Sequence, residues 1–252
     1  MSSISIAEIN RTAEEYIRQL PELCLPPGHP GNRTMAAWID HTLLKPDASP
    51  VQIEQLCTEA KRYHFASVCV NPLFVDLAAK QLDNSGVAVC AVVGFPLGAT
   101  PSRVKVAEAR ACLEMGAKEI DMVVPIGLLK AGFLEEVMDD IQSVSDAVHA
   151  QGAIVKVILE NAFLDTRAKI SGCLICAAAG ADFVKTSTGF GPGGATLEDV
   201  ELMRRVVGPQ MGVKAAGGVR TLADARAFLA VGASRLGSSS GVKIMQEIEA
   251  EG

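Results

Sequence analysis

Three charged residues of the sequence stand inside short runs of β-branched and small apolar residues: Asp121, Lys185 and Lys214. Lysine and aspartate side chains are almost never fully buried unless they are paired. A lysine held near a second cation loses its proton more readily, and the neutral amine attacks a carbonyl to form an imine. The protonated imine then acts as an electron sink for carbon–carbon cleavage. We therefore expect one of the two lysines to be a nucleophile, with Asp121 and the other lysine as proton carriers.

A network of internal salt bridges is the alternative explanation for the same three residues, because buried charges are also retained when they are paired. A network of this kind would not require the glycine- and serine-rich segments Gly217-Gly218 and Gly237–Ser240, which follow the last two apolar runs. Such segments let the backbone approach an anion, and a helix N-terminus supplies free N–H donors. The serines of Gly237–Ser240 are explained equally well as residues that cap the N-terminus of a helix. Together, the lysines and these loops favour a reaction site that binds a phosphate.

Strand-like and helix-like segments alternate along the chain from Ile39 onward. Eight short apolar runs are each followed by a helix-compatible segment, which is typical of a parallel sheet and, at eight units, of a closed barrel. A length of 252 residues also suits one (β/α)8 barrel, which typically takes about 250. The expected strands are Ile39–Leu44, Ala66–Val70, Ala88–Gly94, Glu119–Pro125, Ile154–Glu160, Phe183–Ser187, Val213–Ala216 and Arg235–Gly237. The sequence therefore predicts an α/β protein with a single (β/α)8 TIM barrel.

An additional helix is expected before the barrel. Ser3–Leu20 has an apolar face, and the proline- and glycine-rich stretch Pro21–Gly31 follows it. We expect residues 1–34 to form this N-terminal helix and linker, and residues 35–252 to form the catalytic barrel. The helix is predicted to cover the base of the barrel or to contribute to a subunit contact in a homo-oligomer.

Composition excludes several classes of partner. The net charge of -6 and the absence of a basic stripe argue against nucleic acid and anionic membranes, and no apolar run is long enough for a membrane helix. Seven scattered cysteines fit a reducing cytoplasm, and the N-terminus lacks the pattern of a signal peptide. Cys173 and Cys176 have C-x-x-C spacing, but they lie in a helical run and are more simply buried packing residues. The four histidines have no metal-ligand spacing, so no metal site is expected.

Barrel enzymes place their sites at the carboxyl ends of the strands. Six of the expected strands have polar residues at their carboxyl ends, at positions whose side chains are expected to point into the barrel. These are Asp40, Thr42, Cys69, Asn71, Asp121, Glu160, Lys185, Ser187 and Lys214. Cys69 is expected at the top of the second strand, close to the substrate, although a small buried packing residue is an equally good reading of it.

The sequence resembles the deoxyribose-phosphate aldolase family, the class I aldolases that form a Schiff base, from Ile39 to about Val242. The motifs that carry the resemblance are Ile39-Asp40-His41-Thr42-Leu43-Leu44, Val68-Cys69-Val70-Asn71-Pro72, Val93-Gly94-Phe95-Pro96, Glu119-Ile120-Asp121-Met122-Val123, Lys185-Thr186-Ser187-Thr188-Gly189-Phe190, Lys214-Ala215-Ala216-Gly217-Gly218-Val219-Arg220 and Gly237-Ser238-Ser239-Ser240. Some family members end in a tail whose terminal tyrosine reaches the site. No tyrosine follows Tyr63 in this sequence, so that role is not carried over.

The resemblance implies roles for individual residues. Lys185 would form the Schiff base, and Asp121 and Lys214 would carry protons. The substrate-binding residues would be Asp40, Thr42, Cys69, Thr188, Gly189, Gly217, Gly218, Gly237, Ser239 and Ser240. The implied reaction is the reversible cleavage of 2-deoxy-D-ribose 5-phosphate to D-glyceraldehyde 3-phosphate and acetaldehyde, in deoxyribose phosphate catabolism. It would need no metal and no organic cofactor.

Three other interpretations remain. Gly189–Gly194 matches the G-x-G-x-x-G pattern of dinucleotide-binding proteins. The next strand, however, presents Lys214 instead of an acidic group for a ribose, so we interpret this segment as a flexible loop on the phosphate side. A different lysine-dependent barrel aldolase would share the fold but act on another phosphorylated sugar. A non-catalytic sugar-phosphate sensor should lack the lysines or the aspartate, all of which are present.

Overall fold

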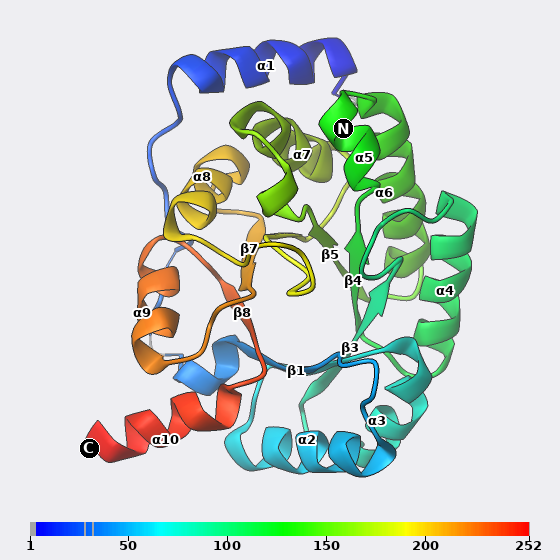
Figure 1. Ribbon diagram of the computed structural model, residues 1–252, viewed down its shortest axis with the longest axis vertical. Helices are drawn as coiled ribbons and strands as arrows, with labels where there is room; N and C mark the ends of the chain where they lie inside the picture. Colours follow the sequence, from blue (N-terminus) through cyan, green and yellow to red (C-terminus); the bar gives the residue numbers. More distant parts are fainter. Residues whose placement is uncertain (1–3, 28, 32, 252) are drawn as a thin grey trace.

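Eight parallel strands close into a barrel in the computed structural model, which describes residues 4–27, 29–31 and 33–251 (Figure 1). Each strand pairs with its neighbours in the sequence, and β8 pairs with β1. The strands are β1 (Ile39–Leu43), β2 (Ser67–Val70), β3 (Ala88–Val93), β4 (Glu119–Val123), β5 (Ile154–Ile158), β6 (Phe183–Lys185), β7 (Gly212–Ala216) and β8 (Arg235–Ser238). The predicted (β/α)8 barrel is confirmed.

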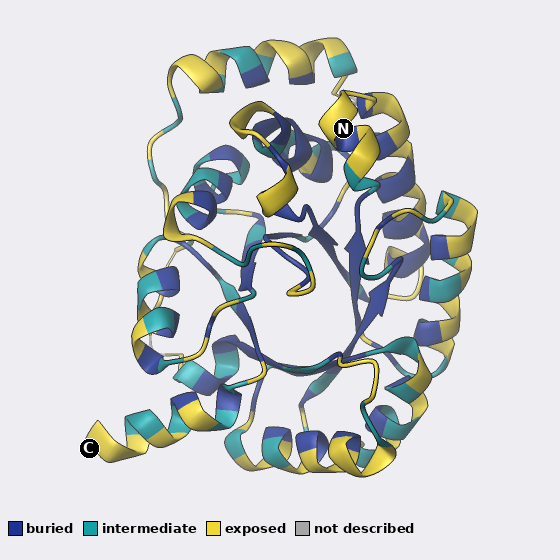
Figure 2. Cartoon of the chain, viewed as in Figure 1, coloured by how far each residue is buried: buried dark blue, intermediate teal, exposed yellow. Residues whose placement is uncertain are grey.

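Helices surround the barrel and turn their buried sides toward it (Figure 2). The α-helices are α1 (Ile6–Arg18), α2 (Pro50–Tyr63), α3 (Val75–Gln81), α4 (Ser102–Glu114), α5 (Ile126–Ala131), α6 (Leu134–His149), α7 (Thr166–Ala178), α8 (Leu197–Val207), α9 (Leu222–Ala230) and α10 (Gly241–Glu251). Short 3-10 turns are η1 (Met35–Trp38), η2 (Pro72–Phe74) and η3 (Asn161–Phe163). Within the described part of the chain, no helix is both long enough and apolar enough to cross a membrane.

Local capping signals explain where several helices begin and end. Asp165, Thr196 and Thr221 each accept a hydrogen bond from a backbone N–H in the first turn of α7, α8 and α9. Pro50 stands in the first turn of α2, where a missing N–H costs nothing. The starts of these helices are therefore set locally, because these caps act over only three or four residues.

Several strands end earlier than the sequence predicts. The expected fifth strand reaches Glu160, but β5 stops at Ile158, and Glu160 has a left-handed backbone with φ of 56°. The expected third strand reaches Gly94, where φ is 61°. The apolar run continues past the hydrogen-bonded ladder at these points, because the chain turns into the loops that surround the barrel mouth.

Helix α1 lies at the side of the barrel and packs against α7 (Figure 1). Ile9 and Ala13 are buried in this contact, and Glu14 forms an ion pair with Arg167. The structure therefore places the helix beside the barrel and not beneath its base. The helix is also shorter than predicted, because it ends at Arg18 and the chain is extended at Gln19. Ile17, which was expected on the apolar face, is exposed, and Ser3 lies outside the described residues.

Candidate active site

A cluster of charged side chains fills the interior of the barrel. Strand register sets Lys185 beside Lys214 and Asp121 beside Lys156, while Lys185 lies two residues above the level of Lys156, so these side chains converge from four consecutive strands. Lys185 Nζ and Lys214 Nζ each donate to Asp121 Oδ2 over 2.7 Å. Lys156 Nζ donates to the other oxygen, Oδ1, over 2.9 Å. The carboxylate of Asp121 is therefore shared by three ammonium groups.

The surroundings of Asp121 keep it ionised. It is fully buried, and burial alone would raise its pKa. The three ammonium groups outweigh burial, and the pKa of Asp121 lies well below its usual range. Asp121 is thus a permanently charged acceptor at neutral pH, which can hold two lysine amines at a fixed distance from each other.

Lys214 has a second carboxylate partner. Its Nζ lies 2.5 Å from Asp40 Oδ2 as well as 2.7 Å from Asp121 Oδ2. Burial alone would lower the pKa of Lys214, but the two carboxylates outweigh burial and raise this pKa above its usual value. Lys214 therefore carries a positive charge throughout the neutral range.

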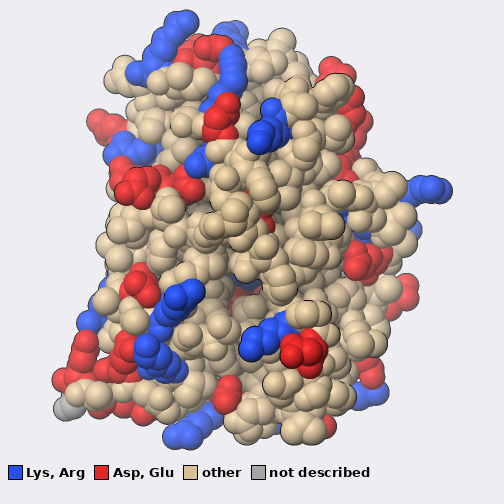
Figure 3. All heavy atoms as spheres, viewed as in Figure 1, with Lys and Arg blue, Asp and Glu red and all other residues tan. Residues whose placement is uncertain are grey.

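Lys185 differs from the other amines of the cluster in its access to solvent. A cavity of about 290 Å³ opens at the carboxyl ends of the strands, and Lys185 lies on its wall. Lys156 and Lys214 do not line this cavity and are fully buried. Figure 3 shows a hollow at the centre of this face of the molecule, with basic side chains near its rim. Among these three lysines, Lys185 alone can meet a substrate without a movement of the barrel.

Seven of the ten predicted substrate-binding residues line the same cavity: Thr42, Thr188, Gly189, Gly217, Gly218, Gly237 and Ser239. Gly217 and Gly218 have φ of 81° and 96°, a conformation that favours glycine, and this brings bare backbone to the cavity wall. Ser238 Oγ donates to Val219 O over 2.7 Å, which ties the β8–α10 turn to the β7–α9 loop. The geometry suits an anion held by the backbone between these two loops.

The other three predicted binding residues lie off the cavity wall. Asp40 is buried beneath it and is held by Lys214, by Arg235 at 2.6 Å and by Ser67 at 2.7 Å. Cys69 points inward but packs in a small apolar cluster with Leu44, Cys90 and Val92. Ser240 donates its N–H to Ser238 Oγ over 2.9 Å. Asp40 and Cys69 thus support the charged cluster from below.

The sequence reading missed Lys156, Glu119 and Arg235 as members of the charged cluster. Lys156 Nζ lies 2.5 Å from Glu119 Oε2, and Arg235 contacts both Glu119 and Asp40. The cluster has four cationic side chains and three carboxylates. Lys156, like Lys185, is a charged residue inside an apolar strand. The alternation of side chains along that strand would have been enough to predict that Lys156 points inward.

The cavity wall also contains side chains that were not predicted, among them Lys45, Phe190 and Arg220. Each of these three lies in a loop that follows a strand, and Phe190 and Arg220 end two of the motifs quoted above. The rule that barrel sites lie at the carboxyl ends of strands would have included them.

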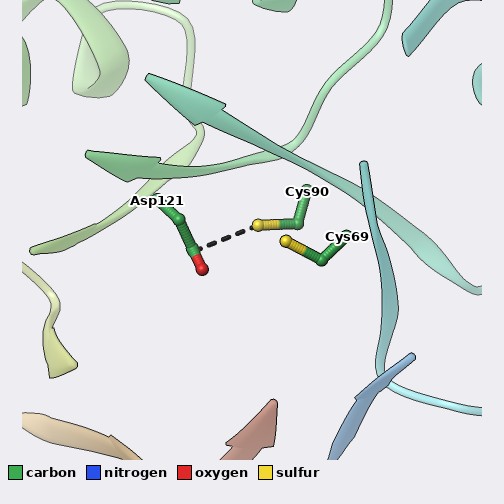
Figure 4. Close-up of side chains that lie close together, drawn as sticks. All are labelled: Cys69, Cys90 and Asp121. Carbon is green, nitrogen blue, oxygen red and sulfur yellow. Dashed lines mark hydrogen bonds between the residues drawn. The ribbon is translucent and has the colours of Figure 1, made fainter. Parts of the chain in front are cut away.

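Cys69, Cys90 and Asp121 form a group that sequence spacing did not reveal (Figure 4). Their possible ligand atoms lie within 4.8 Å of one another, and Cys90 Sγ donates to Asp121 Oδ1 over 3.1 Å. Burial raises the pKa of Cys90 well above its usual value, which disfavours the thiolate that a metal would need. Both oxygens of Asp121 are already held by ammonium groups. This donor set therefore suits a hydrogen-bonded support better than a cation.

The C-x-x-C pair lies far from this chemistry. Cys173 and Cys176 are fully buried within α7, and burial raises the pKa of both thiols. The interpretation of these two cysteines as packing residues is therefore confirmed.

Comparison with known proteins agrees with the geometry. The model of the DeoC/LacD family aldolases matches residues 34–247. A deoxyribose-phosphate aldolase of Thermoanaerobacter sp. (strain X514) is 56% identical over 84% of this chain and 96% of its own. A crystal structure assigned to a deoxyribose-phosphate aldolase of Coccidioides immitis has a TM-score of 0.90 at 41% identity, and it covers 99% of this chain and 100% of its own.

A more distant structure preserves the same fold over the full length. The deoxyribose phosphate aldolase of Aeropyrum pernix, described as a tetramer, has a TM-score of 0.82 at 32% identity and covers 99% of this chain and 100% of its own. The family match and these identities extend over the barrel and all of its charged cluster. The chain therefore belongs to the DeoC/LacD family of aldolases.

Proposed function

We propose that this protein cleaves 2-deoxy-D-ribose 5-phosphate reversibly to D-glyceraldehyde 3-phosphate and acetaldehyde through an imine on Lys185. The observation that carries the proposal is the position of Lys185. Its amine is on the cavity wall and shares one oxygen of Asp121 with a lysine that stays charged. Among the relatives reported above, those with sequence identities of 32% to 56% are described as deoxyribose-phosphate aldolases.

The excess of positive charge in the cluster supports Lys185 as the nucleophile. Four cations share three carboxylates, so one cation lacks a full counter-charge. Lys214 has two close carboxylates, whereas Lys185 has only a share of Asp121. Lys185 is therefore the amine of the cluster with the weakest counter-charge, and it is also the one on the cavity wall. The neutral amine is the form that attacks a carbonyl.

The chemistry then proceeds through the imine. Lys185 Nζ adds to the aldehyde carbon of the open-chain sugar, and water leaves to give a protonated imine. A base removes the proton of the 3-hydroxyl group, the C2–C3 bond breaks, and its electron pair moves to the imine as an enamine. Protonation at C2 and hydrolysis release acetaldehyde. Lys214, held at the same oxygen of Asp121, is the nearest charged donor for the proton transfers.

The phosphate of the substrate is proposed to bind between the β7–α9 and β8–α10 loops. Gly217, Gly218, Gly237 and Ser239 line this side of the cavity, and α10 begins two residues after Ser239. Lys45 and Arg220 add positive charge at the rim, in a protein whose net charge is -6. Backbone N–H groups and two local cations together compensate for the repulsion from the rest of the molecule.

Reduction of the imine tests this proposal directly. The protein is incubated with acetaldehyde and sodium borohydride, and the modified lysine is located by peptide mapping. We expect an adduct on Lys185, and none in Lys185→Met. Glyceraldehyde 3-phosphate should form from 2-deoxyribose 5-phosphate and not from fructose 1,6-bisphosphate. An adduct mainly on Lys214 or Lys156, or cleavage of the hexose bisphosphate alone, would contradict the proposal.

We also propose a homo-oligomer in a reducing cytoplasm. The tetrameric Aeropyrum pernix structure supports the first part, because its fold covers almost all of this chain. The second part is supported by the cysteines, of which all seven are free and six are buried. Light scattering of the purified protein at several concentrations tests the assembly.

A further inference from the structure

Glu160 has a buried carboxylate that the proposed reaction does not use. It follows β5, its side chain is only 1% exposed, and its backbone has φ of 56° and ψ of 61°. Residues other than glycine adopt this left-handed conformation infrequently. Oε1 of Glu160 has no hydrogen-bond partner in the described part of the chain. An uncharged residue could fill this position at a lower desolvation cost, so the charge at Glu160 calls for a specific partner.

The partner of Glu160 is the loop between β6 and α8. Oε2 of Glu160 accepts two hydrogen bonds from Thr188, one from its backbone N–H over 3.1 Å and one from its hydroxyl group. The Thr188 hydroxyl in turn accepts a hydrogen bond from the backbone N–H of Phe190 over 3.0 Å. One carboxylate oxygen therefore determines the course of three consecutive residues, Thr188 to Phe190.

These three residues line the substrate cavity together with Lys185. In Figure 1 their loop, drawn in yellow, crosses in front of the barrel mouth. Phe190 also packs edge-on against Phe95, with ring centroids 5.3 Å apart, although its side chain is half exposed. The bonds from Glu160 hold the first part of the loop, and Ala195 N donates to Ala216 O and Gly217 O at its far end.

The next residue, Gly191, lies against the carboxylate. A Cβ atom at Gly191 would lie 2.9 Å from the Cδ atom of Glu160, which is closer than real Cβ contacts allow. The loop therefore passes over the carboxylate with no room for a side chain. The loop therefore contacts the carboxylate of Glu160 at Gly191 as well as at Thr188.

We propose that Glu160 is a positioning residue that holds Thr188–Phe190 in the shape that forms one wall of the substrate cavity. It sets the affinity for the sugar phosphate and not the rate of carbon–carbon cleavage, because Lys185 and Asp121 are held by the strands. Glu160 itself does not line that cavity and acts through the loop. This proposal rests on the aldolase function proposed above.

Two substitutions of Glu160 separate positioning from packing. Glu160→Ala removes the acceptor, and the released loop then forms the cavity wall for only part of the time. If the wall is present in a tenth of the molecules, the apparent affinity falls tenfold. We therefore expect KM for 2-deoxyribose 5-phosphate to rise about tenfold, with kcat changed by less than about threefold. Glu160→Gln keeps a carbonyl oxygen that can accept both hydrogen bonds from Thr188, so its KM should stay close to that of the wild type.

Gly191→Ala provides an independent test, because it displaces the carboxylate without removing it. KM should rise in Gly191→Ala, whereas the double variant Glu160→Ala with Gly191→Ala should match Glu160→Ala alone. Such non-additivity identifies a shared contact. Borohydride trapping of acetaldehyde on Lys185 should proceed at the wild-type rate in every variant, since Lys185 is positioned by β6 and Asp121 and not by the loop.

The outcomes distinguish this proposal from the function on which it rests. A wild-type protein that neither cleaves the sugar phosphate nor traps acetaldehyde on Lys185 overturns both. A wild type that does both, with an unchanged KM in Glu160→Ala, overturns the positioning role only. The same holds if Glu160→Gln loses as much affinity as Glu160→Ala, or if the effects of Glu160→Ala and Gly191→Ala simply add. Gly191→Ala and Glu160→Gln keep the test decisive if Glu160→Ala does not fold.

Discussion

Removal of the positive charge of Lys214 should make imine formation on Lys185 require a higher pH. The two amines donate to the same oxygen, Asp121 Oδ2, over 2.7 Å each, so they lie no farther apart than twice this distance. Lys214 stays charged because its two carboxylates raise its pKa. In Lys214→Met this repulsion is absent, and Asp121 stabilises the ammonium form of Lys185 alone. Both changes favour the protonated amine, which cannot attack a carbonyl.

The size of the effect follows from the geometry. Two unit charges about 5 Å apart, at an effective dielectric constant of about 20, repel by roughly 3 kcal/mol. At about 1.4 kcal/mol for each tenfold change in proton affinity, this corresponds to about two pH units. The acidic limb of the pH–rate profile should therefore move upward by about two pH units, and imine formation on that limb should slow.

The assay measures the rate at which acetaldehyde and borohydride modify Lys185 between pH 5 and pH 9. Lys214→Arg is the control, because it keeps the charge, and its acidic limb should stay in place even if its maximum rate falls. The double variant Asp121→Asn with Lys214→Met, compared with Asp121→Asn alone, measures the repulsion in the absence of the carboxylate that partly masks it. An acidic limb that moves in neither Lys214→Met nor the double variant would show that desolvation, and not charge, activates Lys185.

Further outcomes are expected from other parts of the molecule. Arg204→Met should lower the free energy of unfolding in urea by about 2–4 kcal/mol, because Arg204 is buried and donates to Gly232 O and Met211 O. Imine trapping per folded molecule should be unchanged in this variant. The urea midpoint should fall as the pH drops below about 4. The reason is that cations lower the pKa values of Asp40 and Asp121 in the folded state, so both carboxylates take up protons on unfolding. Asp40→Asn should weaken this dependence of the urea midpoint on pH. A thiol reagent at pH 8 should modify one cysteine rapidly in the native protein and none in Cys24→Ser, because Cys24 alone among the seven is exposed. Cleavage of the sugar phosphate should survive EDTA, since the protonated imine serves as the electron sink; a loss of activity that zinc restores would contradict the imine route.

The strands and the three central charges could be predicted from the sequence because both signals are local. An apolar run of a few residues indicates a buried strand, and because side chains alternate between the two faces of a strand, the position of a charge within the run indicates whether it faces inward. Asp121, Lys185 and Lys214 all follow this rule. Lys156 follows it as well and could have been predicted to face inward, whereas its pairing with Glu119 is recognised only when β4 and β5 are set in register.

The rest of the site depends on contacts that no short segment encodes. The bond from Thr188 to Glu160 joins residues 28 positions apart, and it decides where Phe190 lies on the cavity wall. The exclusion of Cys69 from the wall depends on how its small side chain packs with Leu44 and Val92. The alternation of side chains along a strand therefore predicts which of them point into the barrel. Contacts with residues of other strands and loops decide which of these side chains reach the substrate.

The ion pair between Arg235 and Asp40 crosses the seam where β8 meets β1 and closes the barrel. These residues are 195 positions apart in the chain, so the pair cannot form until nearly all of the protein has been synthesised and its last strand has docked. Before that moment Asp40 lacks its arginine, and the edges of β1 and β7 are both open. The arrangement that holds Lys214 is consequently complete only when the seam between β8 and β1 is closed. A half-barrel fragment of this chain should therefore be inactive, and mixing two fragments should restore imine trapping only when the seam between β8 and β1 is re-formed.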